Sequence, residues 1–116
     1  MSFKTEFSLE DRIKESSRIL QKYPDKVPII CEKSREASIE CPDIDKKKYL
    51  VPKELTLGQF IYVLRKRLKL GPEKAIFLFI GKSIAPSSHS VYQIYNFYKD
   101  TDGFLYISYT LENVFG

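Results

Sequence analysis

The sequence predicts one α+β domain, in which helices pack on a four-stranded mixed sheet. The chain has 116 residues, the size of a single domain, and 43% of them are hydrophobic, which suits a globular core. Capping patterns mark three helices, and short apolar or β-branched runs mark four strands. The longest apolar run, residues 75–80, is far shorter than the roughly twenty residues that span a bilayer, so we expect no transmembrane helix.

The first predicted helix begins after Ser8 and ends near Tyr23. Ser8 is a hydroxyl N-cap followed by acidic residues, and Pro24 disfavours helical geometry in the residue before it. Helical spacing is kept by Leu9, Ile13, Ser16 and Leu20. On another side Glu15 and Ile19 lie four residues apart, so we expect an acid beside an exposed aliphatic side chain, which can line a binding groove.

Residues 27–32 are apolar and β-branched, which predicts a strand with Pro28 near its start or at an edge. Cys31 lies in this strand and Cys41 follows ten residues later. The two could form one disulfide. The N-terminus has no signal peptide, so we expect a cytosolic or nuclear chain with two unpaired thiols.

Residues 47–52 predict a second strand with two distinct sides. Lys48 and Leu50 point to one face, and Tyr49 and Val51 point to the other. One strand can therefore contribute to two separate surface pockets.

The clearest helix begins after Thr56, where Gln59 completes a capping box, and the predicted stop is Gly71-Pro72. Its core-facing stripe contains Leu57, Phe60, Ile61, Leu64 and Leu68. Val63 and Arg67 share a neighbouring flank with Phe60 by helical spacing. Because this flank ends in a guanidinium, we expect it to reach the surface.

Residues 75–80 predict a central strand buried on both faces, Ser90 and Gln93 cap a short helix, and residues 104–109 alternate as a last strand. From Thr110 onward there is no periodicity, so we expect a mobile tail. The order helix, strand, strand, helix, strand, helix, strand fits the ubiquitin-like β-grasp. Other α+β arrangements fit the same order.

Residues suited to catalysis or metal binding are scarce. His89, the only histidine, stands among serines in a polar loop, and the cysteines lack the close spacing of zinc ligands, so we predict no catalytic residue, metal or cofactor. Residues 81–83 imitate the end of a phosphate-binding loop. The glycine that such a loop requires five residues earlier is Ile76, and Pro86 stands in the place of its helix, so we expect an ordinary loop.

The net charge is +4, and basic residues are densest at 46–48 and 65–69. Such clusters suit nucleic acid, an anionic membrane or an acidic peptide. Single-stranded nucleic acid needs exposed aromatic rings beside the cations, and most aromatics here are expected to face the core, with Tyr49 beside Lys48 as the exception. We expect no nucleic-acid binding. The alternative, a basic nucleic-acid module, predicts a footprint on Lys47, Arg65, Lys66 and Lys69.

Several stretches resemble the GABARAP-like autophagy modifiers, ubiquitin-like proteins that become attached to phosphatidylethanolamine. They are residues 23–28, 45–52, 55–60, 65–67 and 104–106, together with Gly116. The resemblance implies a β-grasp preceded by two N-terminal helices, the first around Phe3 to Glu6. We accordingly divide the single domain into a helical extension (1–24), a ubiquitin-like core (25–110) and a flexible conjugation tail (111–116).

The resemblance implies a modifier rather than an enzyme. An activating enzyme would adenylate Gly116, conjugating enzymes would carry it as a thioester, and phosphatidylethanolamine would receive it. Phe115 is expected to help the processing protease and the conjugation enzymes recognise the tail. Because the sequence ends at Gly116, we expect an encoded terminal glycine or a processed or truncated form. The protein would be cytoplasmic, and peripheral on autophagosomal membranes when lipidated.

The family also binds receptor and adaptor peptides that carry an aromatic residue and, three positions later, an aliphatic one. Positions that match its aromatic pocket are Glu15, Ile19, Pro28, Ile30, Lys48, Leu50 and Phe104. Positions that match its aliphatic pocket are Tyr49, Val51, Pro52, Leu55, Phe60 and Val63. Lys46 and Arg67 are expected to attract acidic residues that flank such motifs. An unconjugated peptide-binding adaptor is the alternative.

Overall fold

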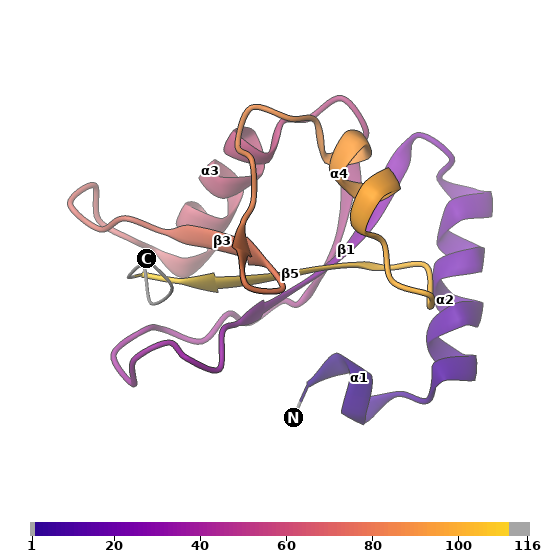
Figure 1. Cartoon of the computed structure of the whole chain (residues 1–116), viewed down its shortest axis with the longest axis horizontal. Helices are drawn as coiled ribbons and strands as arrows, with labels where there is room; N and C mark the ends of the chain where they lie inside the picture. Colours follow the sequence, from indigo (N-terminus) through magenta and orange to yellow (C-terminus); the bar gives the residue numbers. More distant parts are fainter. Residues whose placement is uncertain (1, 112–116) are drawn as a thin grey trace.

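A five-stranded mixed sheet lies between helices in the computed structural model, which describes residues 2–111 (Figure 1). The strand order is β2-β1-β5-β3-β4, with β1 and β5 parallel and the other neighbours antiparallel. In chain order the elements are α1 (Phe3–Glu6), α2 (Leu9–Lys22), β1 (Lys26–Lys33), β2 (Lys48–Pro52), α3 (Leu57–Leu68), β3 (Phe77–Ile80), β4 (Ser83–Ile84), α4 (Val91–Tyr98) and β5 (Leu105–Thr110). The predicted β-grasp architecture and its two N-terminal helices are confirmed.

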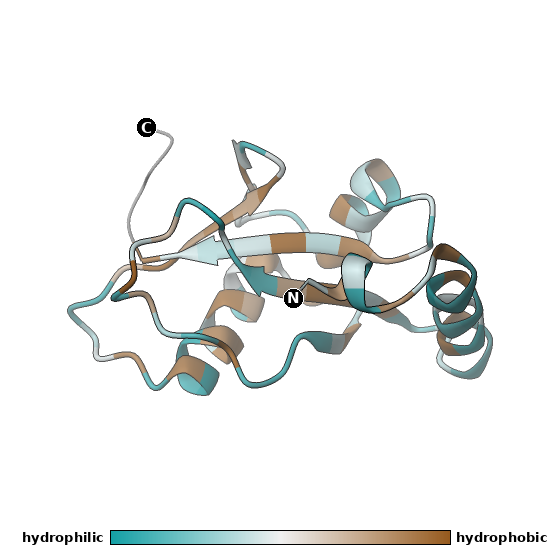
Figure 2. Ribbon diagram, turned by 90° about the horizontal axis from the view of Figure 1, so that it is seen from below, coloured by the Kyte–Doolittle hydropathy of each residue, from teal (hydrophilic) through white to brown (hydrophobic). Residues whose placement is uncertain are grey.

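Side chains of the central strands alternate between two buried layers. One set packs in a large core with α3 and α4, and it includes Val27, Ile29, Cys31, Leu105, Ile107 and Tyr109. The other set packs in a smaller core with α1 and α2, and it includes Ile30, Phe104, Phe3 and Ile19. Figure 1 shows α3 and α4 above the sheet, α1 below it and α2 at one end, and Figure 2 looks onto the face that carries α1.

The predicted helix starts are confirmed. Ser8 accepts a hydrogen bond from the amide of the third residue of α2, and both Thr56 and Ser90 form full capping boxes. The stop of α3 differs from the prediction, because the helix ends at Leu68 and Lys69 takes the left-handed cap position with φ 57°. Glycine usually fills that position, so the prediction placed the stop at the next glycine along the chain.

The prediction of four strands is wrong by one strand. Gly81 has φ 63° and occupies the first place of a two-residue loop, which reverses the chain so that Ser83 pairs with Ile80 and Ile84 with Phe79. Glycine at this place is typical of a tight hairpin turn. A strand of two residues has no periodicity that a sequence pattern can detect.

The neighbouring strand and the chain after β5 also differ in their bounds. β3 begins at Phe77 rather than at Ala75, because its partner β5 ends at Thr110, which lies opposite Phe77. Ala75 is exposed, and β3 is not buried along its whole length. Thr110, expected to begin a mobile tail, is buried and ends β5. The rest of the predicted tail after Leu111 lies outside the described residues.

The prediction that α2 exposes Ile19 is wrong. Ile19 is 1% exposed and belongs to the small core with Ile30 and Phe104. The aliphatic residues of the predicted helical pattern, Leu9, Ile13 and Leu20, are exposed instead. Periodicity identified the helix correctly, but this helix packs through only a narrow stripe, and the pattern did not tell which stripe.

A buried carboxylate ties α2 to the loop before β5. The side chain of Asp102 is 0% exposed, and its Oδ2 lies 2.7 Å from Arg12 Nη1. The Tyr106 hydroxyl donates to the same oxygen, and the Phe104 amide donates to Oδ1 at 2.9 Å. Burial, together with the hydrogen bond to Asp102, raises the pKa of Tyr106 above its ordinary value. The carboxylate is therefore satisfied on both oxygens without contact with water.

The same loop approaches α2 closely at Gly103. The Ser16 hydroxyl donates to the Asp102 carbonyl at 2.6 Å, and a Cβ at Gly103 would collide with that hydroxyl. Gly103 also has φ 91°, which disfavours other residues. Only glycine lets α2 lie this close to the loop.

We predict that Asp102→Ala lowers the free energy of unfolding by about 3 kcal/mol, because it leaves the Arg12 guanidinium and the Tyr106 hydroxyl without their buried partner. Urea denaturation measures this change. The control is Glu54→Ala, an exposed carboxylate, which should change stability by less than about 0.5 kcal/mol. Equal losses in the two variants would contradict the prediction.

Candidate functional site

The outer edge of β2 carries unpaired backbone groups. On the inner side the Cys31 amide donates to the Lys47 carbonyl at 2.8 Å. Because bonding alternates along an antiparallel pair, the odd-numbered residues of β2 bond to β1, and the amides and carbonyls of Lys48 and Leu50 point away from the sheet. Among residues 2–111 the sheet has no strand beyond β2. An extended peptide can therefore pair with this edge.

The predicted aromatic pocket has a buried floor. Ile19 from α2, Ile30 from β1 and Phe104 before β5 belong to one buried cluster. Pro28 is also buried and stands opposite Leu50, whose side chain is 37% exposed. The fold thus brings these positions together, with the edge strand above the apolar floor.

Charged side chains form the rim of this pocket. Lys48 stands opposite Ile30, and its Nζ lies 3.5 Å from Glu15 Oε1. Glu15 also forms an ion pair with Arg18. Burial acts to raise the pKa of Glu15, but Arg18 and Lys48 outweigh it, so this pKa is lowered and the carboxylate stays charged. The Glu15–Lys48 pair spans from α2 to β2 beside the pocket floor.

The predicted aliphatic pocket lies on the other face of β2, against α3. The Tyr49 and Phe60 rings meet edge to face with centroids 5.4 Å apart, and Val51 and Leu55 pack in the same core. Val63, one turn after Phe60, is exposed, as is Pro52 at the end of β2. These contacts link Tyr49, Phe60, Val51 and Leu55. Val63 and Pro52 lie at the surface beside them.

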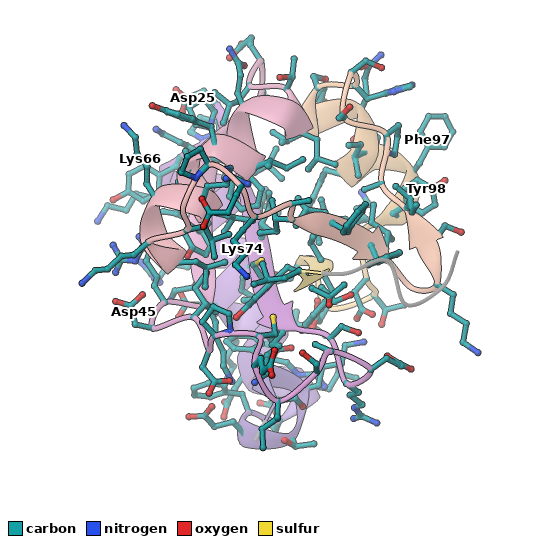
Figure 3. The ribbon with its side chains drawn as sticks, turned by 90° about the vertical axis from the view of Figure 1, so that its left-hand side faces the viewer. Asp25, Asp45, Lys66, Lys74, Phe97 and Tyr98 are labelled. Atoms are coloured by element: carbon teal, nitrogen blue, oxygen red, sulfur yellow. The ribbon has the colours of Figure 1, made fainter. Side chains whose placement is uncertain are left out.

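The two cations expected to attract acidic flanks already have partners within the chain. Lys46 Nζ lies 5.1 Å from the centroid of the Tyr49 ring, and Arg67 Nε lies 2.9 Å from Asp45 Oδ1. The Arg67–Asp45 pair is exposed and therefore contributes little stability. An acidic group on a ligand can replace Asp45 at small cost. Figure 3 labels Asp45 on this surface and Lys66 on α3.

The expectation that Tyr49 is an exposed aromatic beside the cations is wrong. Its side chain lies in the core, and Tyr49 is 6% exposed. The expected nucleic-acid footprint is also partly occupied, since Lys47 Nζ lies 3.3 Å from Glu32 Oε2 and the Arg65 guanidinium donates to the Gly71 carbonyl at 2.7 Å. The arrangement offers no aromatic platform at the place where the sequence predicted one.

Comparison with known proteins identifies the family. A family model described as "Autophagy protein Atg8 ubiquitin like" matches residues 11–116. Autophagy-related protein 8 of Mycosarcoma maydis is 56% identical over 115 residues, covering 99% of this chain and 96% of that protein. Autophagy-related protein 8a of Arabidopsis thaliana is also 56% identical, covering 99% of this chain and 93% of that protein. The crystal structure of Trypanosoma brucei ATG8 superposes with a TM-score of 0.91 at 40% identity, covering 100% of this chain and 98% of that one.

This chain belongs to the Atg8 family. It is a ubiquitin-like modifier of autophagy, with full-length relatives and the same fold. None of the helices in residues 2–111 is long and apolar enough to cross a membrane. Gly116 and Phe115, predicted for conjugation and tail recognition, lie outside the described residues.

Both cysteines of this Atg8-family protein are buried thiols, and Cys31 lies in β1 as predicted, whereas the burial of Cys41 was not predicted. Burial raises the pKa of the Cys31 thiol well above its ordinary value, which keeps the thiol protonated and unreactive. His89 is exposed in its loop. Within the part of the chain that the structure describes, no group of three His, Cys, Asp or Glu side chains is arranged to hold a metal ion.

Sequence reasoning missed Arg12 and Asp102, which hold α2 in its place beside the aromatic pocket. Arg12 and Asp102 are 90 residues apart, so no local pattern connects them. A partial signal was present, because Asp100 followed by Asp102 and Gly103 is typical of a side-chain-stabilised turn. The structure contains that turn, with the Asp102 amide donating to Asp100 Oδ2 at 3.1 Å.

The Tyr49 hydroxyl is buried and has no hydrogen-bond partner among the described residues. Burial raises the pKa of Tyr49 to about 12. We predict that Tyr49→Phe increases the free energy of unfolding by about 1 kcal/mol, because it removes an unsatisfied polar atom. The matched control is Tyr95→Phe, which should decrease it by about 1 kcal/mol, since the Tyr95 hydroxyl donates to the Gly103 carbonyl at 2.7 Å. Chemical denaturation compares them; a destabilised Tyr49→Phe would contradict the prediction.

Proposed function

We propose that this protein is a GABARAP-like modifier that is conjugated through Gly116 to phosphatidylethanolamine on autophagosomal membranes. There it recruits receptors and adaptors that carry aromatic-x-x-aliphatic motifs. The observation that carries the peptide half of the proposal is the open edge of β2, with one apolar site on each face of the same strand.

The spacing of the motif follows from this edge. A peptide that pairs with Lys48 and Leu50 lies as a strand, and its side chains alternate between the two faces. Residues three positions apart therefore point to opposite faces. The aromatic side chain would enter above Ile30 and Phe104, and the aliphatic one would reach Val63 and Leu55 beside α3. Acidic flanks would exchange with Asp45 at Arg67 and meet Lys46.

In the proposed conjugation this chain supplies the Gly116 carboxylate, and the nucleophilic cysteines belong to the partner enzymes. An activating enzyme would adenylate the Gly116 carboxylate, enzyme cysteines would carry the acyl group as a thioester, and the lipid amine would displace the thiol to form an amide. Phe115 would serve the processing protease and the conjugating enzymes as a recognition residue. The chain is the acyl donor in this proposal, and its own thiols, Cys31 and Cys41, are buried.

The proposed division of the chain separates the parts that bind peptides from the tail that is conjugated. Residues 1–24 form the helical extension, residues 25–110 form the ubiquitin-like core, and residues 111–116 form the conjugation tail. The protein would be cytoplasmic before conjugation and peripheral on the autophagosomal membrane after it. Residues 1–24 supply one wall of the peptide site through Glu15 and Ile19, so we treat all three parts as one functional domain.

We predict that Gly116→Ala abolishes lipid attachment and leaves peptide affinity unchanged. The chain is incubated with the family's activating and conjugating enzymes, ATP and liposomes that contain phosphatidylethanolamine, and intact mass reports a lipid-sized gain. Leu50→Ala is the matched control and should still gain the lipid, because Leu50 belongs to the proposed peptide site and does not take part in the proposed conjugation. A lipid-linked Gly116→Ala chain would show that the acyl-donor assignment is wrong.

We predict that Leu50→Ala weakens binding of an aromatic-x-x-aliphatic peptide about tenfold, because it removes apolar contact at the aromatic site. Isothermal titration calorimetry measures the Kd. Tyr62→Ala, an exposed side chain of α3, serves as the control and should change the Kd less than about twofold. Equal weakening by both substitutions would place the peptide elsewhere.

A further inference from the structure

A cavity separate from the predicted peptide pockets lies at the end of the sheet where β1 begins. It has a volume of about 250 Å³ and is bounded by the end of α2, the start of β1, the residue after β2 and one side of α4. Figure 1 shows α4 and the end of α2 on either side of the start of β1. The apolar and aromatic residues of its lining are Leu20, Pro24, Val27, Tyr92 and Tyr95, and Asn96 is an uncharged polar one. No proposed peptide-pocket residue lines this cavity.

Three lysines from three elements line the same cavity, namely Lys26, Lys53 and Lys99, and its lining contains no acidic residue. None of the three has an ion-pair partner among residues 2–111. Lys53 Nζ lies 4.4 Å from the Tyr92 ring centroid, and Lys99 Nζ lies 5.5 Å from the Tyr95 ring centroid. The cavity therefore combines uncompensated positive charge with aromatic walls.

The backbone that carries these lysines is held by hydrogen bonds. The Lys53 amide donates to the Asp25 carbonyl at 3.1 Å, and the Tyr92 amide donates to the Lys53 carbonyl at 3.3 Å. Lys26 stands opposite Pro52 in the β1–β2 ladder. The Tyr95 ring is fixed by burial and by the bond of its hydroxyl to Gly103. The backbone of the site and the Tyr95 ring are therefore in place before a ligand binds, which reduces the ordering cost of binding.

We propose that this cavity binds a phosphotyrosine side chain of a protein partner. A phosphoryl group carries about −1.5 to −2 charges at neutral pH, which suits three lysines better than a single carboxylate does. The apolar walls and the two tyrosine rings suit an aryl stem below that group. The volume accommodates one side chain, whereas sites for whole small-molecule ligands usually start at about 300 Å³.

The site is independent of the edge of β2. Its lining contains no residue of β2, since Lys53 follows the last residue of that strand, Pro52. It includes residues of α4, which contributes nothing to either predicted peptide pocket. A partner could therefore occupy the edge and the cavity with two separate segments. Occupation of both would increase the apparent affinity through the linker between them.

The test is a chemical-shift titration of the isotope-labelled full chain with phenyl phosphate, with phenol and inorganic phosphate as comparison probes. We expect saturable shifts at the amides of Lys53, Tyr92 and Asn96, with phenyl phosphate binding at least about fivefold more tightly than either comparison probe. Lys53→Met and Lys99→Met keep the aliphatic stem and remove the charge, and each should raise the Kd for phenyl phosphate at least about fivefold.

Lys82→Met is the matched control, because Lys82 is an exposed lysine of the β3–β4 turn outside this cavity, and it should leave the Kd unchanged. The proposal is overturned by an equal loss in Lys82→Met, by equal affinity for inorganic phosphate and phenyl phosphate, or by the absence of a saturable shift. A tyrosine-phosphorylated peptide should then bind and its unphosphorylated form should not. The chain could instead fail to bind that peptide and bind phosphoinositide vesicles in a way that Lys53→Met abolishes. This result would assign the cavity to a lipid headgroup and overturn the proposal of a protein partner.

Discussion

The buried carboxylate of Asp102 is the contact on which the geometry of the candidate site depends. It accepts from Arg12 on α2, from Tyr106 on β5 and from the Phe104 amide, so one side chain fixes helix, strand and loop relative to each other. A buried charge is costly when any partner is missing. Alternative placements of α2 would leave this carboxylate unpaired, and the contact therefore specifies where α2 lies. Because α2 carries Glu15 and Ile19, the position of the aromatic pocket follows from it.

The presence of one apolar site on each face of β2 follows from the sheet topology. β5 occupies one side of β1 in a parallel pair, so β2 pairs on the other side, and no further strand joins β2 among residues 2–111. Its alternation places Tyr49 in the large core with α3 and leaves Leu50 on the face of α2. Two separate apolar sites on one strand thus need no special local structure. They require only that both faces of the sheet are covered and that the strand between them stays unpaired on one side.

Local sequence patterns correctly predicted features that neighbouring residues determine. They failed for side chains whose burial depends on contacts with residues far away in the sequence. The caps at Ser8, Thr56 and Ser90 and the alternation of residues 48–51 need only neighbouring residues, and the structure has them. The burial of Ile19 depends on contacts with β1 and the loop before β5, which spacing within α2 cannot reveal. The burial of the Tyr49 side chain depends in the same way on its contact with Phe60. The pocket positions came from the family resemblance; five of them, residues 48–52, lie on β2, and the others come from α2, β1, α3 and the segments that follow β2 and precede β5.

An open strand edge is also a risk, since it can pair with other copies of the chain. β2 limits this risk in three ways that are also useful for binding a peptide. It has five residues, it ends with Pro52, which has no amide to donate, and it directs Lys48 outward beside Glu15. In a parallel, in-register pair of two such edges Lys48 would lie beside a second Lys48, which opposes that pairing. An acidic peptide would instead gain from the same lysine. The charge that protects the edge therefore also selects the class of segment that can add to it.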